Sequence, residues 1–82
     1  MNKPTLVQYK PNLNKIEIGH LTLYFSYAEC IGFQVDNNEP VFSENIWSVT
    51  TAKHLNFLGS KKENRLPREQ FLELLDHHVN YR

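Results

Sequence analysis

Three polar side chains with recognition chemistry lie close together between residues 53 and 56: Lys53, His54 and Asn56. Lys53 and Asn56 are three positions apart, so on a helix they share a face and can act on one ligand group. His54 lies beside them and can donate or accept a hydrogen bond near neutral pH. These side chains therefore form a candidate partner-binding site, although the same pattern is also typical of an ordinary solvated helix face.

The other reactive side chains have no spacing that suits catalysis or metal binding. His77 and His78 are adjacent, so on a helix they point ~100° apart and do not share a face as metal ligands at i and i+4 do. Cys30 lies in an apolar strand pattern, which is typical of a buried small hydrophobe, and no motif places it against a base. We therefore expect a non-enzymatic protein with no catalytic residue, no metal and no cofactor.

The charges are unevenly distributed, although the formal net charge is zero. Between residue 16 and residue 52 there are Asp and Glu residues but no Lys or Arg, and we call this stretch the acidic half. The following stretch carries a basic ridge made of Lys53, Lys61, Lys62, Arg65 and Arg68. This basic ridge could hold nucleic-acid phosphates.

The acidic half offers a second kind of interface. It could dock on a basic patch of another protein, steered by charge. Tyr24, on the outward side of its strand pattern, would be an exposed aromatic anchor for that interface, with Glu44 on the same acidic half. Charged patches of both signs can also simply solvate a small domain, so the charge map leaves these alternatives open.

These residues must be positioned by a small α+β fold. Apolar alternation predicts strands at residues 5–9, 15–18, 21–27, 30–36 and 40–44, with turns at 11–14 and 36–39. Helical spacing follows at residues 51–58 and 68–79. Because short turns connect the strands, we expect an antiparallel β-meander of about four strands followed by two helices packed on one face. The chain should form a single domain, residues 1–82, with loose ends at 1–4 and 80–82.

Local signals define the two helices. Thr50 or Thr51 can open the first helix, because a side-chain oxygen can accept a backbone N–H there. Gly59 is a natural stop, since it enters the left-handed region without Cβ strain. Pro67 suits the first turn of the second helix, where its missing N–H costs nothing.

The periodicity also predicts the core. Strand residues facing one way and helix residues at three-to-four spacing should be buried together, with Trp47 closing one end. The predicted core residues are Leu21, Leu23, Phe25, Phe33, Val35, Trp47, Leu55, Phe71, Leu74 and Leu75.

The chain has no secretory segment at its start, and no apolar run approaches the ~18 residues needed to span a membrane. With a single cysteine, no disulfide can form within the chain. We therefore expect a cytosolic protein that does not associate with membranes. Its oligomeric state stays open.

One segment also carries a family resemblance. Its pattern is Trp47-Ser48-x-Thr50-Thr51-x-Lys53-His54-Leu55-Asn56. Within a similarity that runs from about residue 16 to residue 79, this segment resembles a group of short phage and prophage proteins of unknown function. Ala52 departs from the Gly expected there.

The resemblance carries over no catalytic residue. It implies a viral accessory protein in the host cytoplasm that works by binding host machinery or nucleic acid. We therefore expect an interaction module or inhibitor that binds a host or defence protein. The alternative is a nucleic-acid-binding module that uses the basic ridge.

Overall fold

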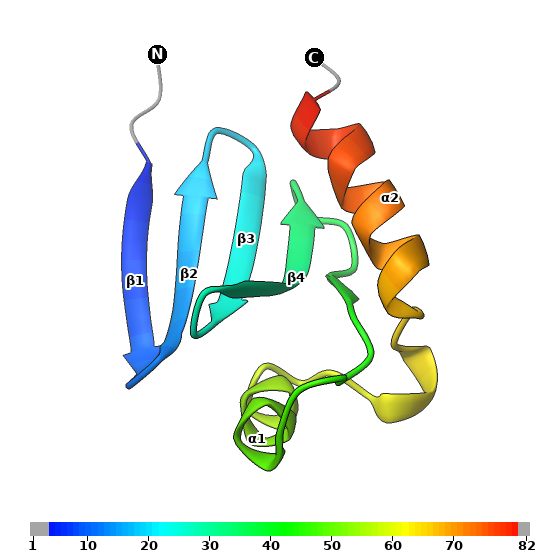
Figure 1. Cartoon of the computed structure of the whole chain (residues 1–82). Helices are drawn as coiled ribbons and strands as arrows, with labels where there is room; N and C mark the ends of the chain where they lie inside the picture. Colours follow the sequence, from blue (N-terminus) through cyan, green and yellow to red (C-terminus); the bar gives the residue numbers. More distant parts are fainter. Residues whose placement is uncertain (1–3, 81–82) are drawn as a thin grey trace.

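A computed structural model describes residues 4–80, so residues 1–3, 81 and 82 of the predicted loose ends lie outside the described residues. The strands are β1 (Thr5–Lys10), β2 (Leu13–Ile18), β3 (Leu21–Ser26), β4 (Glu29–Val35) and β5 (Val41–Phe42). The helices are α1 (Val49–Phe57), the short 3-10 helix η1 (Lys62–Asn64) and α2 (Arg68–Asn80). Asn80, also predicted to be loose, ends α2. The predicted α+β class, a meander followed by two helices, is confirmed (Figure 1).

The sheet of the described residues has five strands in chain order, each antiparallel to the next, where about four were predicted. Tight turns make this order, and the predicted turn at Asp36 has the expected left-handed backbone, with φ of 52°. The turn predicted at residues 11–14 is shorter. Asn12 takes the left-handed conformation, with φ of 65°. Leu13 already begins β2 and is fully buried.

The register brings one set of apolar strand residues together on a shared face. Leu6 pairs with Ile16, Ile16 with Leu23, and Leu23 with Phe33, so these four side chains form one row across β1 to β4. We call this side of the sheet the apolar face. The alternate side chains, such as Tyr24, lie on the opposite face.

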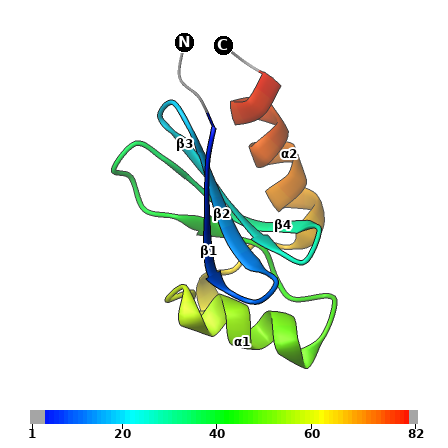
Figure 2. The same cartoon turned by 90° about the vertical axis from the view of Figure 1, so that its left-hand side faces the viewer.

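The two helices contact different parts of the sheet. α2 lies against the apolar face at the β4 side, where the rings of Phe71 and Phe33 are 5.5 Å apart (Figures 1 and 2). α1 lies across the lower end of the sheet and contributes Leu55 to the core cluster. As a result, α2 covers the apolar face at the β4 side and leaves the part over β1 to β3 uncovered.

The core cluster differs from the predicted core. It contains Leu13, Ile31, Phe42 and Leu55. Half-buried Tyr24, Trp47 and Leu58 pack against this cluster. Phe42 lies on Gly32, where a Cβ atom would meet its ring at 2.6 Å, so only glycine leaves room for the ring.

Of the predicted core residues, Phe33, Leu55 and Phe71 are buried as expected. The remaining ones are half-buried, except Leu74, which is 37% exposed. Those half-buried residues are Leu21, Leu23, Phe25, Val35, Trp47 and Leu75. For Leu21, Leu23 and Phe25 on β3, burial was overestimated because two helices were predicted to cover this face, whereas among the described residues only α2 lies on it, at the β4 side.

Helix α1 begins at Val49, two residues earlier than predicted. Its N-cap is Ser48, whose Oγ accepts the Thr51 N–H at 3.3 Å, so neither Thr50 nor Thr51 opens the helix. Gly59 follows the helix with φ of +84°, as predicted. No helix among residues 4–80 is long and apolar enough to cross a membrane.

Candidate functional site

The structure divides the predicted recognition trio. Lys53 and Asn56 are exposed, but His54 is 5% exposed and points into the protein. The reason is helical phase, because His54 follows Thr51 by three positions and both face the lower end of the sheet. The prediction that His54 shares an outer surface with Lys53 and Asn56 was therefore wrong.

His54 belongs to a buried polar cluster that joins α1 to β3. Its Nδ1 is 2.7 Å from the Ser26 Oγ, which is 3.1 Å from the Thr51 Oγ1. Burial lowers the pKa of His54, and the nearby Lys10 ammonium lowers this pKa further. A serine beside a histidine can form a nucleophile and base. Here Ser26 is only 2% exposed, so a substrate cannot reach the hydroxyl, and the cluster is structural.

Tyr24 and Glu44 also have structural partners. The Tyr24 ring is half-buried against Phe42, with centroids 6.0 Å apart, and its hydroxyl donates to the Gln34 Oε1 at 3.4 Å. Tyr24 is therefore not the exposed anchor that the strand pattern predicted. Glu44 is exposed, but its Oε2 accepts the Arg68 N–H at 2.8 Å and so caps the start of α2.

Arg68 is used inside the fold as well. Its guanidinium donates to the Cys30 carbonyl at 2.7 Å and to the Glu29 Oε1 at 3.4 Å. It also lies over the Trp47 ring, 4.6 Å from the centroid, and over the Phe71 ring at 5.3 Å. These contacts fasten the start of α2 to β4, so Arg68 is not an exposed member of the basic ridge.

Arg65 organises the loop that connects the two helices. It donates from Nε to the Ser60 Oγ at 2.9 Å and from Nη2 to the Asn56 Oδ1 at 3.2 Å. The amide of Asn56 is thereby engaged as well. The basic ridge is reduced to its exposed lysines, which are Lys53, Lys61 and Lys62.

The acidic half is likewise divided. Glu17 forms an ion pair with Lys15 at 3.1 Å on the face opposite the apolar face. Glu29 pairs with Arg68, and Glu44 caps α2. The acidic side chains therefore do not gather into one docking patch around Tyr24.

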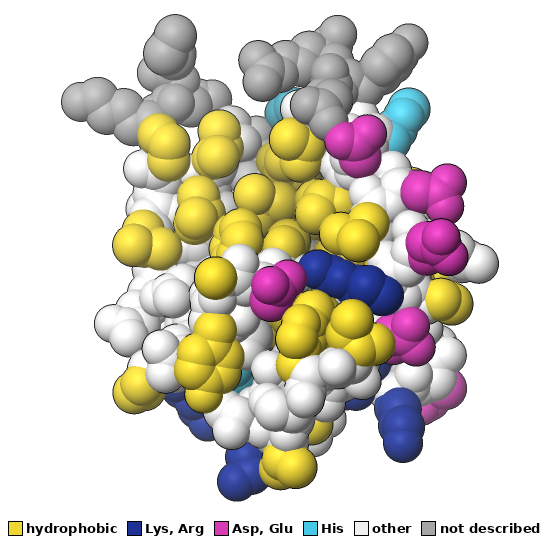
Figure 3. Space-filling model, in the orientation of Figure 1, with side chains coloured by type: hydrophobic (Ala, Val, Ile, Leu, Met, Phe, Trp, Pro, Cys, Tyr) yellow, Lys and Arg dark blue, Asp and Glu magenta, His cyan; other side chains and the backbone are white. Residues whose placement is uncertain are grey.

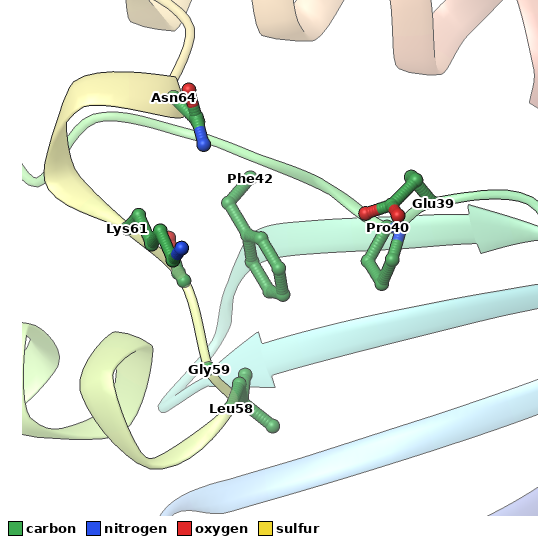
Figure 4. A pocket seen from close by; sticks show the side chains of 8 residues that line it. Glu39, Pro40, Phe42, Leu58, Gly59, Lys61 and Asn64 are labelled. Carbon is green, nitrogen blue, oxygen red and sulfur yellow. The ribbon is translucent and has the colours of Figure 1, made fainter.

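A surface hollow lies between the β4–β5 connection and the loop after α1 (Figure 4). Phe42 lies at its centre, with Glu39 and Pro40 on one side and Lys61 on the other. Its lining contains no histidine, cysteine or paired carboxylates, and the hydroxyl of the lining residue Ser60 accepts a hydrogen bond from Arg65. The thiol of Cys30 lies elsewhere, and burial raises its pKa to about 11, which keeps it protonated at neutral pH.

The surface that the sequence interpretation missed is the open part of the apolar face. Figure 3 shows hydrophobic side chains gathered over β1 to β4 and continuing onto α2. Leu6 is 67% exposed and Ile18 is 43% exposed, while Ile16, Leu21 and Leu23 are half-buried. Monomeric proteins rarely leave a large contiguous apolar patch in water without a use for it. The apolar alternation of the strands indicated that one side of the sheet is apolar, but not that α2 alone would cover it.

Helix α2 adds a wall to this surface. An α-helix turns ~100° per residue, so Leu72, Leu75 and Val79 form a flank next to Phe71. Leu72 is 45% exposed and Val79 is 38% exposed. The three side chains line a shallow hollow together with Glu73 and Asp76. We call the exposed floor and this flank together the open apolar face.

These features define a small α+β domain whose sheet presents an open apolar face beside a single helix. A family model, described as a family of unknown function (DUF8033), matches residues 2–73. The chain therefore belongs to this family. No curated protein and no solved structure matches this chain.

Proposed function

We propose that the protein is a small non-catalytic phage accessory protein, which acts in the host cytoplasm by binding a host or defence protein. The open apolar face is the surface that contacts this partner. The observation that carries the proposal is the contiguous exposed field over β1 to β3, which includes Leu6 and Ile18. The phage context rests on the resemblance of the segment from Trp47 to Asn56.

The shape and chemistry of the open apolar face favour a protein as the ligand. The face is broad and shallow, whereas small-molecule sites are concave and place a few polar groups around the ligand. An exposed apolar field rimmed by polar residues is typical of protein–protein interaction sites. Binding through such a face needs no catalytic group, and inhibition would follow from covering a functional surface of the partner.

The test is affinity capture from host lysate treated with nuclease, followed by the same capture with two matched variants. Ile18→Lys places a charge on the open apolar face. Val49→Lys is the control, because Val49 is 74% exposed at the start of α1, away from that face. We expect Val49→Lys to retain a partner that Ile18→Lys loses. Equal capture by both variants would contradict the proposed surface.

A second candidate function, nucleic-acid binding, rests on the three lysines of the basic ridge that remain exposed. Lys53 lies on α1, Lys61 directly precedes η1, and Lys62 is the first residue of η1. Three cations can contact phosphates, but they release few counterions and predict weak, salt-sensitive binding. Loss of the captured partner after nuclease treatment would favour this candidate.

A further inference from the structure

We infer that the open apolar face receives one amphipathic helix of the partner, with Lys or Arg along the edge of its apolar stripe that faces α2. This inference rests on the proposed function and specifies the partner segment. It follows from the width, the chemistry and the charge of the open apolar face.

The width of the uncovered strip fits one helix. Neighbouring strands are about 4.8 Å apart, so β1, β2 and β3 span roughly 10 Å between their outer axes. A helix with its side chains is about 10–12 Å across. α2 already covers the β4 side of the same face. A second helix beside α2 would therefore complete the two-layer arrangement that buries one face of a sheet.

The length fits as well. Each of β1, β2 and β3 has six residues. Six residues at about 3.3 Å each extend about 20 Å. A helix of about 13 residues has that length, and α2, which lies on the same face, has 13 residues.

The floor of the open apolar face is uncharged. The alternation of β1 to β3 places Leu6, Ile16, Ile18, Leu21 and Leu23 on it. The polar side chains on the same face are the neutral Gln8 and Asn14. Charged Lys15 and Glu17 lie on the opposite face and pair with each other. The part of the ligand that contacts the floor must therefore be apolar.

The wall is acidic, and this determines the charge of the ligand. Glu73 lies beside the apolar flank of α2, and Glu69 is exposed one turn before Glu73. Carboxylates along one edge favour a ligand with cations on the facing edge. A second copy of the protein would bring its own Glu69 and Glu73 against these carboxylates if it docked through α2, and like charges would oppose that pairing.

The experiment titrates the purified protein with two synthetic amphipathic helices of about 15 residues that share one leucine stripe. One helix carries Lys beside the stripe, and the other carries Glu at the same positions. Binding is followed by fluorescence anisotropy of a dye on each peptide. We expect the Lys helix to bind at least about tenfold more tightly than the Glu helix, because only the former complements the acidic wall.

Matched variants locate the binding. Leu72→Lys should weaken binding of the Lys helix by about tenfold or more, because it charges the apolar flank, whereas Val49→Lys should leave binding unchanged. Glu73→Lys should shift the preference toward the Glu helix. Glu63→Lys is its control, since Glu63 is exposed in η1, away from the open apolar face.

Three outcomes would overturn the inference. The first is no binding of either helix, and the second is equal binding by the wild type and Leu72→Lys. The third is a dimer in sedimentation velocity that Leu72→Lys dissociates, because a second copy would then cover the face. The proposed function is tested separately: it still stands if no helix binds while Ile18→Lys loses the captured partner, and it fails if Ile18→Lys retains that partner.

Discussion

Replacing Gly32 with alanine tests how the core is built on the face opposite the apolar face. A Cβ atom at Gly32 would lie 2.6 Å from Cδ1 and 2.8 Å from Cε1 of Phe42, and 3.3 Å from the Val41 carbonyl oxygen. Carbon atoms in contact are normally about 3.5–4.0 Å apart, so the ring would have to move by about 1 Å. The ring cannot move freely, because it packs against Tyr24 and is itself only 9% exposed.

We therefore expect Gly32→Ala to lower the free energy of unfolding by about 1–3 kcal/mol, the usual cost of overpacking a core. Phe42→Val removes both atoms of the clash and should itself cost roughly 3 kcal/mol through the lost ring. In the double variant, the added alanine has no ring to displace. The double variant should therefore be clearly more stable than the sum of the two single costs predicts.

The assay is urea unfolding of the wild type, both single variants and the double variant, with tryptophan fluorescence as the signal. Strict additivity of the two costs, or a Gly32→Ala variant as stable as the wild type, would show that the Phe42 ring does not lie on Gly32. The reasoning about this core would then be refuted.

Three further predictions follow from single side chains. Burial holds the pKa of His54 below the ~6.5 of an unfolded chain, so the unfolded state takes up the proton first and the free energy of unfolding falls as pH drops from ~6.5 to the lower folded-state pKa. In urea melts at pH 7.5 and pH 5, His54→Asn should show a smaller fall in this free energy than the wild type. An identical fall would contradict the burial of a neutral His54. Arg68→Lys should cost about 1–2 kcal/mol and change the emission of Trp47, because lysine cannot keep both the stacking and the forked hydrogen bonds; an unchanged melt and spectrum would contradict these contacts. Replacing Lys61 and Lys62 with Glu should abolish any low-salt DNA binding in a gel-shift assay. DNA binding that persists in this variant would show that the basic ridge is not responsible for it.

Local sequence signals were enough to predict the strands, the turn chemistry and both helices. Gly59 follows α1 as predicted, whereas Pro67 directly precedes α2 and does not lie in its first turn; both residues act through their own backbone constraints. The N-cap was misplaced because Ser48, Thr50 and Thr51 can all accept a backbone N–H. Only the course of the preceding chain decides among them, and here Asn45 fixes that course by accepting the Trp47 N–H at 3.0 Å.

The candidate site was harder to predict, because it depends on which side chains the fold uses internally. The sequence shows Arg65 and Arg68 as cations, but not that Arg65 donates to Ser60 and Arg68 to the Cys30 carbonyl. The sequence showed the helical spacing around His54, but it did not show which side of α1 packs against the sheet. The open apolar face depends on what α2 leaves uncovered, which no periodicity reports.

The most direct test of the central claim is methyl NMR of the protein, labelled at isoleucine, leucine and valine, as its captured partner is added. If the open apolar face is the binding surface, the methyl signals of Leu6, Ile18 and Leu72 should shift or broaden first. The exposed methyl groups of Ile46 and Val49, which lie before and at the start of α1, should stay unchanged. Perturbation of Ile46 and Val49 with unchanged signals from Leu6, Ile18 and Leu72 would contradict the account.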